Sequence, residues 1–378
     1  MKVLHINTNY IGTTLHQNMI NALEASDVEN DVFVPTCTKY KAAIVPNANV
    51  HVYKCFWYWD GLSFYFKQWK IWRTFASAFS LDDYDLLHAY TVSTDGNVAY
   101  QANKKYGIKY IVAVRNTDMN YFFKKRFYLR KRGVKILLNA ERICFLSRAY
   151  QEQLLAKYIP EKHRETIRQK SVLMPNGIDD YWLRNLNSND DLVQKMQRMQ
   201  NKQLRIVFAG RIDRFKNCRL TVDACDILKR KGWNVEFHVA GSIAEQAEFD
   251  YINSSGFLVY HGRLTRESLI DLYRNSDIYV MPSHSESFGL TYVEAMSQAL
   301  PVVYTRGQGF DGQHSDGEVG YAVSDTDPNE LAETILKCVK AYNSLSANAV
   351  HAAKQYNWER ICLEYRAMYD MIESEDCQ

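Results

Sequence analysis

The sequence has little glycine or proline, with 17 Gly and 7 Pro among 378 residues, which excludes collagen-like repeats and long linkers. No run approaches the roughly 18 uncharged apolar residues that a membrane-spanning helix needs. The opening residues MKVLHI lead into a short strand-like run, without the long apolar core and small-residue cleavage site of a secretory signal. We therefore expect the protein to stay in the cytosol.

Cysteine pairs with metal-binding spacing are also missing. There is no CxxC pair and no histidine at zinc-finger spacing among the eight cysteines, which are Cys37, Cys55, Cys144, Cys218, Cys225, Cys338, Cys362 and Cys377. This scatter is typical of reduced, mostly buried thiols. We expect neither disulfides nor structural zinc.

What is present is an ordinary globular composition with an uneven charge distribution. Hydrophobic residues make up 47% and charged residues 24%, and the length suits two domains. Residues 1–175 carry 25 basic and 14 acidic residues, or +11, whereas residues 176–378 carry 21 and 29, or −8. Residues 101–150 alone hold 13 basic and 2 acidic residues. This patch is expected to attract an anion: nucleic acid, an anionic membrane surface or a phosphorylated substrate.

Strand-like apolar runs alternate with amphipathic helical segments along the whole chain. The predicted strands of the first half are 2–7, 31–35, 86–89, 110–114, 142–146 and 171–174. Those of the second half are 204–209, 235–240, 257–260, 278–281 and 301–304. The alternation predicts the α/β class, with two Rossmann-like doubly wound domains whose parallel sheets are covered on both faces.

The domain boundary is expected at the turn-forming cluster Pro175-Asn176-Gly177. We assign residues 1–176 to the first domain, with 358–378 as a closing helix that packs back on it, and 177–357 to the second, with the polar stretch 180–202 as a bridge. Doubly wound sheets bind ligands beyond the carboxyl ends of their strands. Two such domains facing each other would place the chemistry in post-strand loops that line a central cleft.

Two loops of the second domain carry the chemical signals. In the first, Gly210 permits a tight turn, and Arg211 and Lys216 can converge on a diphosphate. In the second, a predicted helix opens near Gly289 between the carboxylates of Glu286 and Glu294. Helix N-terminal amides bind anions, and carboxylates accept hydrogen bonds from sugar hydroxyls. Solvated loop cations and a capped helix with solvated acids are the alternatives.

Read together, these segments resemble the family-4 retaining glycosyltransferases of the GT-B fold, of the kind that act in bacterial capsular, exopolysaccharide or cell-wall glycan synthesis. The matching features occur in the family's order along essentially the whole chain. They are the opening strand with the Gly12 loop, the run 85–89, the Pro175–Asp179 signature, Gly210-Arg211 with Lys216, the Glu286-x7-Glu294 motif and the terminal Trp358–Ile361 segment.

The resemblance implies a role for each matching residue. Arg211 and Lys216 would bind the donor diphosphate, Glu286 the donor sugar and Glu294 the nucleoside ribose. The amides after the Phe-Gly pair would hold the phosphates, and the loops 241–242 and 262–264 would contact the base. The implied donor-binding residues are Gly12, Gly210, Gly241, Arg263, Leu264, Ser287, Phe288, Gly289, Leu290 and Glu294. The family favours a UDP-sugar, with GDP-sugars next.

One position departs from the family pattern. A histidine that contacts the donor sugar often follows the strand matching 110–114, whereas this chain has Arg115-Asn116-Thr117-Asp118. A permanently charged Arg115 cannot act as a neutral imidazole, so we expect it to contact the donor phosphate, an acidic sugar or the acceptor. Asp118 is expected to orient an acceptor hydroxyl.

We expect no metal and no other cofactor, the nucleotide-sugar being a substrate. Two Asp-x-Asp matches occur, but 83–85 precedes a strand, at the wrong end of the sheet, and 325–327 precedes a predicted turn and helix. Arg211, Lys216 and the helix terminus would then neutralise the diphosphate. The expected reaction is transfer with retention, in which the leaving phosphate takes the proton from the acceptor hydroxyl.

Aromatic and basic residues alternate between 53 and 79, and again in 122–132. This mixture suits an anionic membrane interface, and core packing is the alternative. We predict peripheral attachment to the inner membrane face and a glycan or lipid-diphosphate-linked acceptor. Competing hypotheses are a GT-B-fold nucleotide-sugar epimerase and a catalytically weak nucleotide-sugar-binding scaffold. Nucleic-acid binding is not expected, because no recognisable module is present.

Overall fold

The computed structural model describes residues 1–12, 14–38, 49–188 and 191–374. The chain divides into two compact units. Unit 1 comprises Met1–Leu146, Tyr150–Gly177 and Trp358–Gln378, and unit 2 comprises Ser147–Ala149 and Ile178–Asn357. Each unit is built on one parallel sheet, of seven strands in unit 1 and six in unit 2 as far as the residues are described. The predicted α/β fold with two doubly wound sheets is confirmed.

The sheet of unit 1 has the strand order β3-β2-β1-β4-β5-β6-β7. Its strands are β1 Lys2–Ile6, β2 Glu29–Cys37, β3 Val50–Phe56, β4 Leu86–Ala89, β5 Tyr110–Val114, β6 Arg142–Phe145 and β7 Ser171–Leu173. The helices are α1 Thr14–Glu24, α2 Phe64–Ala78, α3 Asp95–Tyr106, α4 Arg130–Asn139, α5 Arg148–Lys157, α6 Glu161–Lys170 and α15 Trp358–Ser374.

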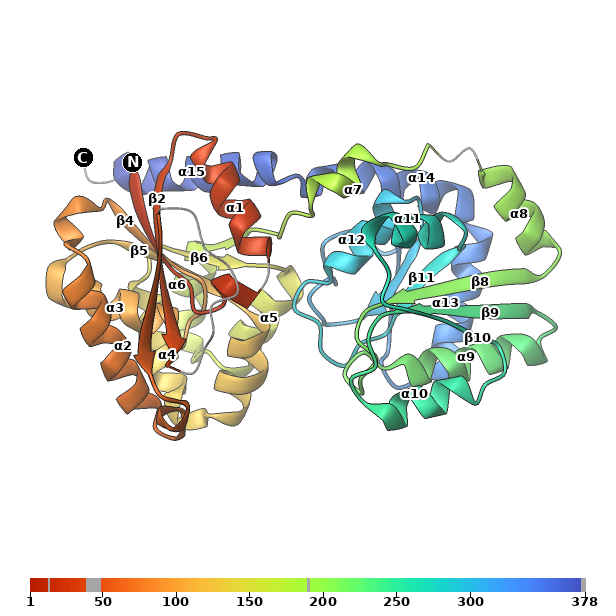
Figure 1. The fold of residues 1–378 in the computed structure, drawn as a ribbon, viewed down its shortest axis with the longest axis horizontal. Helices are drawn as coiled ribbons and strands as arrows, with labels where there is room; N and C mark the ends of the chain where they lie inside the picture. The colour runs from red at the N-terminus through yellow and green to blue at the C-terminus, as the bar shows by residue number, and fades with distance from the viewer. Residues whose placement is uncertain (13, 39–48, 189–190, 375–378) are drawn as a thin grey trace. The chain divides into compact units, whose positions relative to one another are not determined.

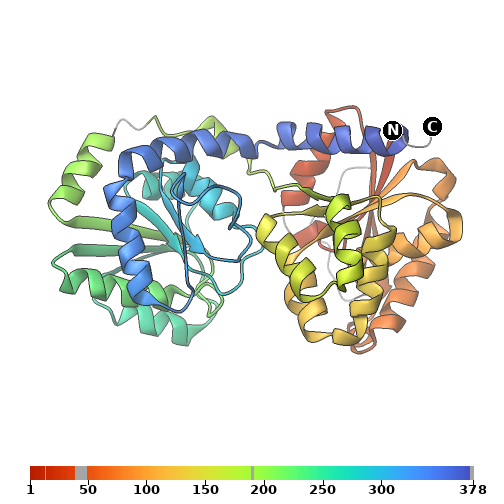
Figure 2. The same cartoon turned by 180° about the vertical axis from the view of Figure 1, so that it is seen from behind.

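Alternation along the strands supplies apolar side chains to both faces of this sheet. In β1, Leu4 and Ile6 join a core with helices α2 to α6, whereas Val3 joins a second core with α1 and α15. Figures 1 and 2 show α15 lying beside α1, although the two helices are far apart in the chain. The segment 358–374 therefore completes the core of unit 1.

The sheet of unit 2 has the order β10-β9-β8-β11-β12-β13. Its strands are β8 Gln203–Ala209, β9 Asn234–Ala240, β10 Leu258–Gly262, β11 Ile278–Met281, β12 Val302–Thr305 and β13 Gly320–Val323. The helices are α7 Asp180–Arg184, α8 Leu192–Gln200, α9 Cys218–Arg230, α10 Gln246–Asn253, α11 Arg266–Arg274, α12 Leu290–Ser297, α13 Pro328–Lys340 and α14 Tyr342–Ala353. Helix α9 packs on α10 and α13, and α12 packs on α14 (Figure 1).

The structure adds elements that the sequence patterns did not reveal. Strands β3 and β13 are both edge strands, and β3 has only one buried residue, Val50, so its apolar alternation is weak. The predicted bridge 180–202 instead contains helices α7 and α8. Asp179 caps α7 by accepting from the Tyr181 amide at 3.0 Å, and α8 buries Met199, which gives both short helices a local cause.

Candidate functional site

The candidate site of unit 2 lies where its strand order reverses, between β8 and β11. The loops that follow these two strands lead away to opposite sides and leave room for a ligand at the carboxyl end of the sheet. They are residues 210–217 and 282–289, the two loops that carry the signals found in the sequence.

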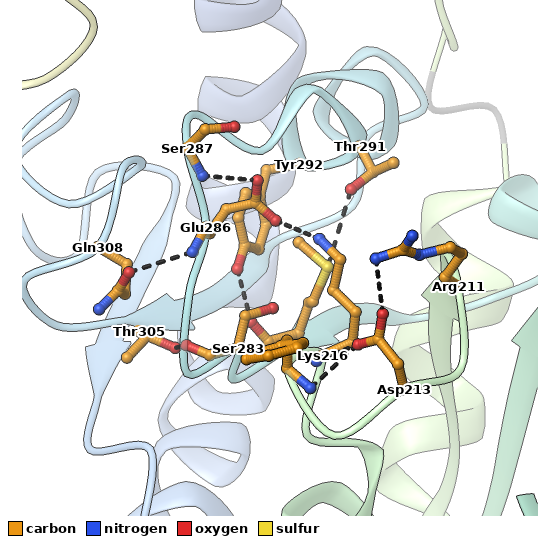
Figure 3. Close-up of polar contacts among 12 residues, drawn as sticks. Arg211, Asp213, Lys216, Ser283, Glu286, Ser287, Thr291, Tyr292, Thr305 and Gln308 are labelled. Carbon is orange, nitrogen blue, oxygen red and sulfur yellow. Dashed lines mark hydrogen bonds and ion pairs between the residues drawn. The ribbon is translucent and has the colours of Figure 1, made fainter. Parts of the chain in front are cut away.

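Asp213 organises the first loop. This buried carboxylate accepts from the amides of Phe215 and Lys216, both at 3.0 Å, through one oxygen. Its other oxygen pairs with the guanidinium of Arg211 at 2.8 Å. The loop thus holds Arg211, itself 66% exposed at the side chain, and Lys216 on the same stretch of backbone (Figure 3).

Glu286 organises the second loop. Its carboxylate accepts from the Ser287 amide at 3.0 Å and forms an ion pair with Lys216 from the first loop. Its own amide donates to the side-chain oxygen of Gln308, at 3.1 Å. Figure 3 shows the Lys216 ammonium reaching the Glu286 carboxylate. The switch point therefore brings together three predicted residues: two cations and one carboxylate.

Two glycines let the second loop pack closely. Gly289, at φ +84°, is the N-cap of α12, and a Cβ there would lie 2.3 Å from the ring of Tyr292. A Cβ on Gly309 would lie 2.0 Å from the carbonyl oxygen of Ser287. Any larger residue at position 309 would therefore clash with the backbone of this loop. The buried Phe288 ring packs on Tyr356, so only the Phe288 backbone can serve a ligand.

The loops after β8, β9 and β10 lie side by side and border a cavity of about 320 Å³. Gly210 donates to the carbonyl of Ala240 at 2.9 Å, and Gly241 donates to that of Gly262 at 2.7 Å. A Cβ on Gly241 would fall 1.7 Å from the Gly210 oxygen, so only glycine permits this approach. The lining residues are Ala209, Gly210, Arg211, Ala240, Gly241, Ser242, Arg263, Leu264, Leu269 and Thr291. Four of the predicted donor-binding residues and Arg211 thus share one cavity.

Glu294 lies in α12, one turn beyond Thr291 of the cavity wall. Burial raises the pKa of its carboxyl from the usual 4.5 to about 7, the positive charge of Arg266 opposing this effect. Leu290 is the first residue of the same helix. The amides of a helix's first turn have no acceptors within the helix and can bind an anion.

In unit 1, Gly12 is exposed at the end of a short 3₁₀ turn, Tyr10–Gly12, after β1. It lines a second cavity, of about 360 Å³, together with Thr8 and Thr36. A Cβ on Gly12 would meet no atom within 4 Å. Packing within unit 1 therefore does not demand glycine here.

Arg115 and Asp118 lie together after β5, but they serve different partners. The Arg115 guanidinium donates to the Asn176 side-chain oxygen at 3.2 Å. Asp118 is fully buried, and its carboxylate accepts from three backbone amides, those of Val92, Ser93 and Arg115, at 3.0 to 3.1 Å. Burial raises the pKa of Asp118, and the three amides oppose this effect. In this structure Asp118 fastens two loops together, a task different from the acceptor contact we expected.

The Pro175–Asp179 signature and the terminal Trp358 segment contact each other in the structure. A Cβ on Gly177 would lie 2.6 Å from the indole of Trp358, so the tryptophan packs directly on the glycine backbone. Asn176 holds Arg115, and Asp179 caps α7. The signature residues thus have structural tasks where the chain passes from unit 1 into unit 2.

Neither Asp-x-Asp match forms an acidic cluster. Asp85 accepts from the Lys2 amide at 2.6 Å, and Asp327 caps α13 by accepting from the Asn329 amide at 2.9 Å. Across the described residues, no group of three or more His, Cys, Asp or Glu side chains is placed to hold a metal ion. The seven described cysteines are free thiols, and Cys377 lies outside the described residues.

Sequence reasoning missed Asp213 and Thr291, whereas Ser242 lies in the predicted base-contact loop 241–242 and does line the cavity. Asp213 accepts from the amides two and three residues further on, those of Phe215 and Lys216. This is the spacing of an Asx turn, so an aspartate at this place in the loop was a usable sequence signal. Thr291 enters the cavity only because β8 and β11 are neighbours in the sheet. No local sequence pattern indicates a contact of this kind.

Comparisons with known proteins agree with this geometry. Residues 190–356 match the family model "Glycosyl transferases group 1", and residues 12–168 match the model "Glycosyl transferase 4-like domain". An uncharacterized glycosyltransferase of Methanocaldococcus jannaschii is 24% identical over 98% of this chain and 99% of its own. The capsular polysaccharide biosynthesis glycosyltransferase CapM of Staphylococcus aureus is 30% identical over 40% of each chain.

Solved structures share the whole architecture. Sucrose-phosphate synthase from Thermosynechococcus elongatus has a TM-score of 0.76 at 17% identity, covering 99% of this chain and 100% of that chain. Anabaena HepE in complex with UDP-glucose has a TM-score of 0.67 at 16% identity, covering 98% and 100%. Two parallel doubly wound sheets, in a chain that matches these structures over almost its whole length, define the GT-B fold. With one family model on each unit, the chain belongs to the family-4 glycosyltransferases, which act with retention.

Proposed function

We propose that this enzyme transfers a sugar from a nucleotide diphosphate donor to a glycan or lipid-diphosphate-linked acceptor, without a metal ion. The observation that carries the proposal is the meeting of Lys216 with Glu286 at the switch point of unit 2, next to the cavity lined by Arg211. Two cations, one carboxylate and a helix N-terminus match the groups of a sugar diphosphate.

The base and ribose would occupy the cavity. Its walls at Gly241, Arg263 and Leu264 offer backbone groups and an apolar side chain to a base. Glu294 would accept hydrogen bonds from the ribose hydroxyls in its ionised form. A UDP-sugar is the favoured donor, because the similar HepE structure is a UDP-glucose complex.

The diphosphate would replace protein partners that the cations have in this structure. Arg211 would turn from Asp213 to the phosphates, and Lys216 would turn from Glu286. Once released, Glu286 can accept from hydroxyls of the donor sugar. Because both cations begin on carboxylates fixed by backbone amides, they are held near the site before the donor arrives.

The reaction would then proceed on one face of the sugar. The acceptor oxygen forms the new bond to the anomeric carbon while the bond to the leaving diphosphate breaks on the same side. The departing phosphate oxygen takes the acceptor's proton. Arg211, Lys216 and the N-terminal amides of α12 would neutralise the growing negative charge, the task that a divalent cation performs in metal-dependent transferases.

The acceptor and the cellular location follow from weaker observations. The relative CapM is named for capsular polysaccharide biosynthesis, which supports a glycan acceptor. No helix among the described residues is long and apolar enough to cross a membrane. The excess of basic residues in 101–150 supports peripheral attachment to the inner, anionic face of the membrane.

Thermal unfolding with UDP, GDP, ADP and dTDP, each with EDTA and with magnesium, tests the donor site. A ligand at 100 times its dissociation constant stabilises the folded state by about 2.7 kcal/mol. We expect a shift with UDP that persists in EDTA and is clearly smaller in Lys216→Met. No shift with any diphosphate would contradict the site, and a shift seen only with magnesium would contradict the metal-free mechanism. Substrate turnover with labelled donor then separates transfer from epimerisation or simple binding.

A further inference from the structure

Two segments of unit 1 expose aromatic side chains to an unusual degree. Nine of the 19 exposed large apolar side chains found in the described residues lie within 57–69 and 121–128. They are Trp57, Tyr58, Trp59, Tyr65, Phe66, Trp69, Tyr121, Phe127 and Tyr128. Trp59 is 70% exposed and Phe127 is 71% exposed. Scattered surface aromatics need no explanation, whereas a gathering of this size indicates an interaction surface.

Buried contacts join these two segments into one surface, which we call the aromatic–basic face and define as residues 57–69 and 121–131. Phe64 of α2 packs against Phe122, with ring centroids 5.8 Å apart, and Leu129 completes this small core. The core is separate from the two larger cores of unit 1. Its effect is to hold two segments that are some 60 residues apart in the sequence side by side.

The first segment forms a fixed turn with apolar tips. A 3₁₀ turn, Tyr58–Leu62, connects β3 to α2. The Asp60 carboxylate accepts from the Trp57 amide at 2.7 Å and pairs with Lys70 at 2.6 Å. Because Asp60 secures the turn, the neighbouring Trp57, Tyr58 and Trp59 project from it while remaining more than half exposed.

The second segment supplies positive charge. Residues 121–132 contain six basic residues and no acidic one. Arg130 and Arg132 bind protein oxygens, those of the Phe123 carbonyl and the Asn97 side chain. Lys124, Lys125 and Lys131 are exposed. These three lysines extend the positive charge of the face into solvent.

We infer that the aromatic–basic face is the surface on which the enzyme lies against an anionic lipid bilayer. Tryptophan and tyrosine rings settle at headgroup depth, and nearby lysines attract anionic headgroups. A neutral glycan would gain nothing from the cations, and none of the nine exposed rings lines the cavity of unit 1. The inference deepens the proposed function and rests on it for its biological meaning, since a membrane-bound acceptor would be presented at this face.

The test is vesicle flotation of the full-length chain, with pure phosphatidylcholine or with 30% phosphatidylglycerol, at low and high salt. Two variants divide the face: Trp57→Ala/Trp59→Ala removes apolar tips, and Lys124→Gln/Lys125→Gln/Lys131→Gln removes three charges. Lys337→Gln/Lys340→Gln/Lys354→Gln is the matched control, because these lysines are exposed in unit 2. The unfolding shift with UDP, measured on every variant, reports the donor site independently.

We expect the unmodified enzyme to float with anionic vesicles only, and less at high salt. Each lysine near an anionic surface is worth about fivefold in affinity, so the triple variant should bind about 100-fold more weakly. The tryptophan variant should lose at least tenfold, and the control triple variant should match the unmodified enzyme. No flotation with anionic vesicles at low salt, equal flotation of all variants, or loss only through a change in oligomeric state would overturn the inference. A preserved UDP shift in any of these cases would leave the donor site standing.

Discussion

Glu294 offers the sharpest test of the donor site, because its burial links stability to pH. Its pKa is raised from 4.5 to about 7 by burial. At about 1.4 kcal/mol per pH unit, the ionised carboxylate costs the folded state about 3 kcal/mol. The folded state therefore binds a proton more tightly than the unfolded state, and stability falls as pH rises from 4.5 to 7. Above pH 7 the whole cost is present.

Glu294→Gln removes this titration, so its effect on stability should depend on pH. At pH 5 the variant should unfold close to the unmodified enzyme. At pH 8 it should be more stable, with an unfolding midpoint about 5 °C higher or more. The measurement is thermal unfolding at both pH values, following the transition that UDP shifts. Glu333→Gln is the control, because Glu333 is an exposed glutamate of α13 in the same unit.

UDP binding should show the opposite trend. If the ionised Glu294 accepts from the ribose hydroxyls, UDP affinity in the unmodified enzyme should rise between pH 6 and pH 8. The glutamine variant should bind UDP more weakly and with a flat pH profile over the same range. A midpoint difference that is the same at pH 5 and pH 8 would refute the pKa argument. UDP affinity unaffected by the substitution would refute the ribose contact.

Three further substitutions test single contacts. Gly241→Ala should lower the free energy of unfolding by about 2–4 kcal/mol and abolish UDP binding, because its Cβ would overlap the Gly210 carbonyl oxygen. The measurement is urea unfolding, and the control is Gly256→Ala, since Gly256 also has a positive φ but open space around it. Asp118→Ala should cost about 3 kcal/mol or more by leaving three amides without their acceptor; a change under 1 kcal/mol would contradict the fastening task. Lys216→Met should weaken UDP binding about 10- to 100-fold in calorimetry with stability little changed, and unchanged affinity would contradict its phosphate contact.

The sequence patterns predicted buried strands well and edge strands poorly. Residues 86–89, 110–114 and 278–281 are strands at the predicted bounds, because continuous apolar runs between turn residues leave a buried strand few alternatives. Strand β3 was not predicted, because most of its residues are partly exposed and its sequence shows no clear alternation of apolar and polar residues. Among the aromatic residues between 53 and 79, Phe56 ends β3 and the next three lie in the turn before α2.

Site residues could be predicted where they directly follow a strand that the sequence itself reveals. Arg211, Lys216 and Glu286 each follow a recognisable strand, and the structure brings them together. The task of Asp118 was not predictable, because its acceptor geometry depends on β4 and β5 being neighbours. The same holds for the contact of Phe64 with Phe122, which merges two separate aromatic segments into one surface. Tertiary contacts of this kind leave no periodic signal in a sequence.

Helix α15 has a consequence for the order in which the protein can be completed during synthesis. Its Tyr369 hydroxyl reaches His88 at 2.7 Å, and Trp358 and Cys362 fill the core beside α1. About 180 residues of unit 2 must be translated between the body of unit 1 and this helix. Domains that are synthesised first usually fold first. Here unit 1 cannot complete its core until α15 has been translated, whereas unit 2 can already fold. In a nascent chain of this enzyme, unit 1 should therefore need protection of its exposed apolar face until synthesis is complete. A truncation after residue 357 should lower the stability of unit 1.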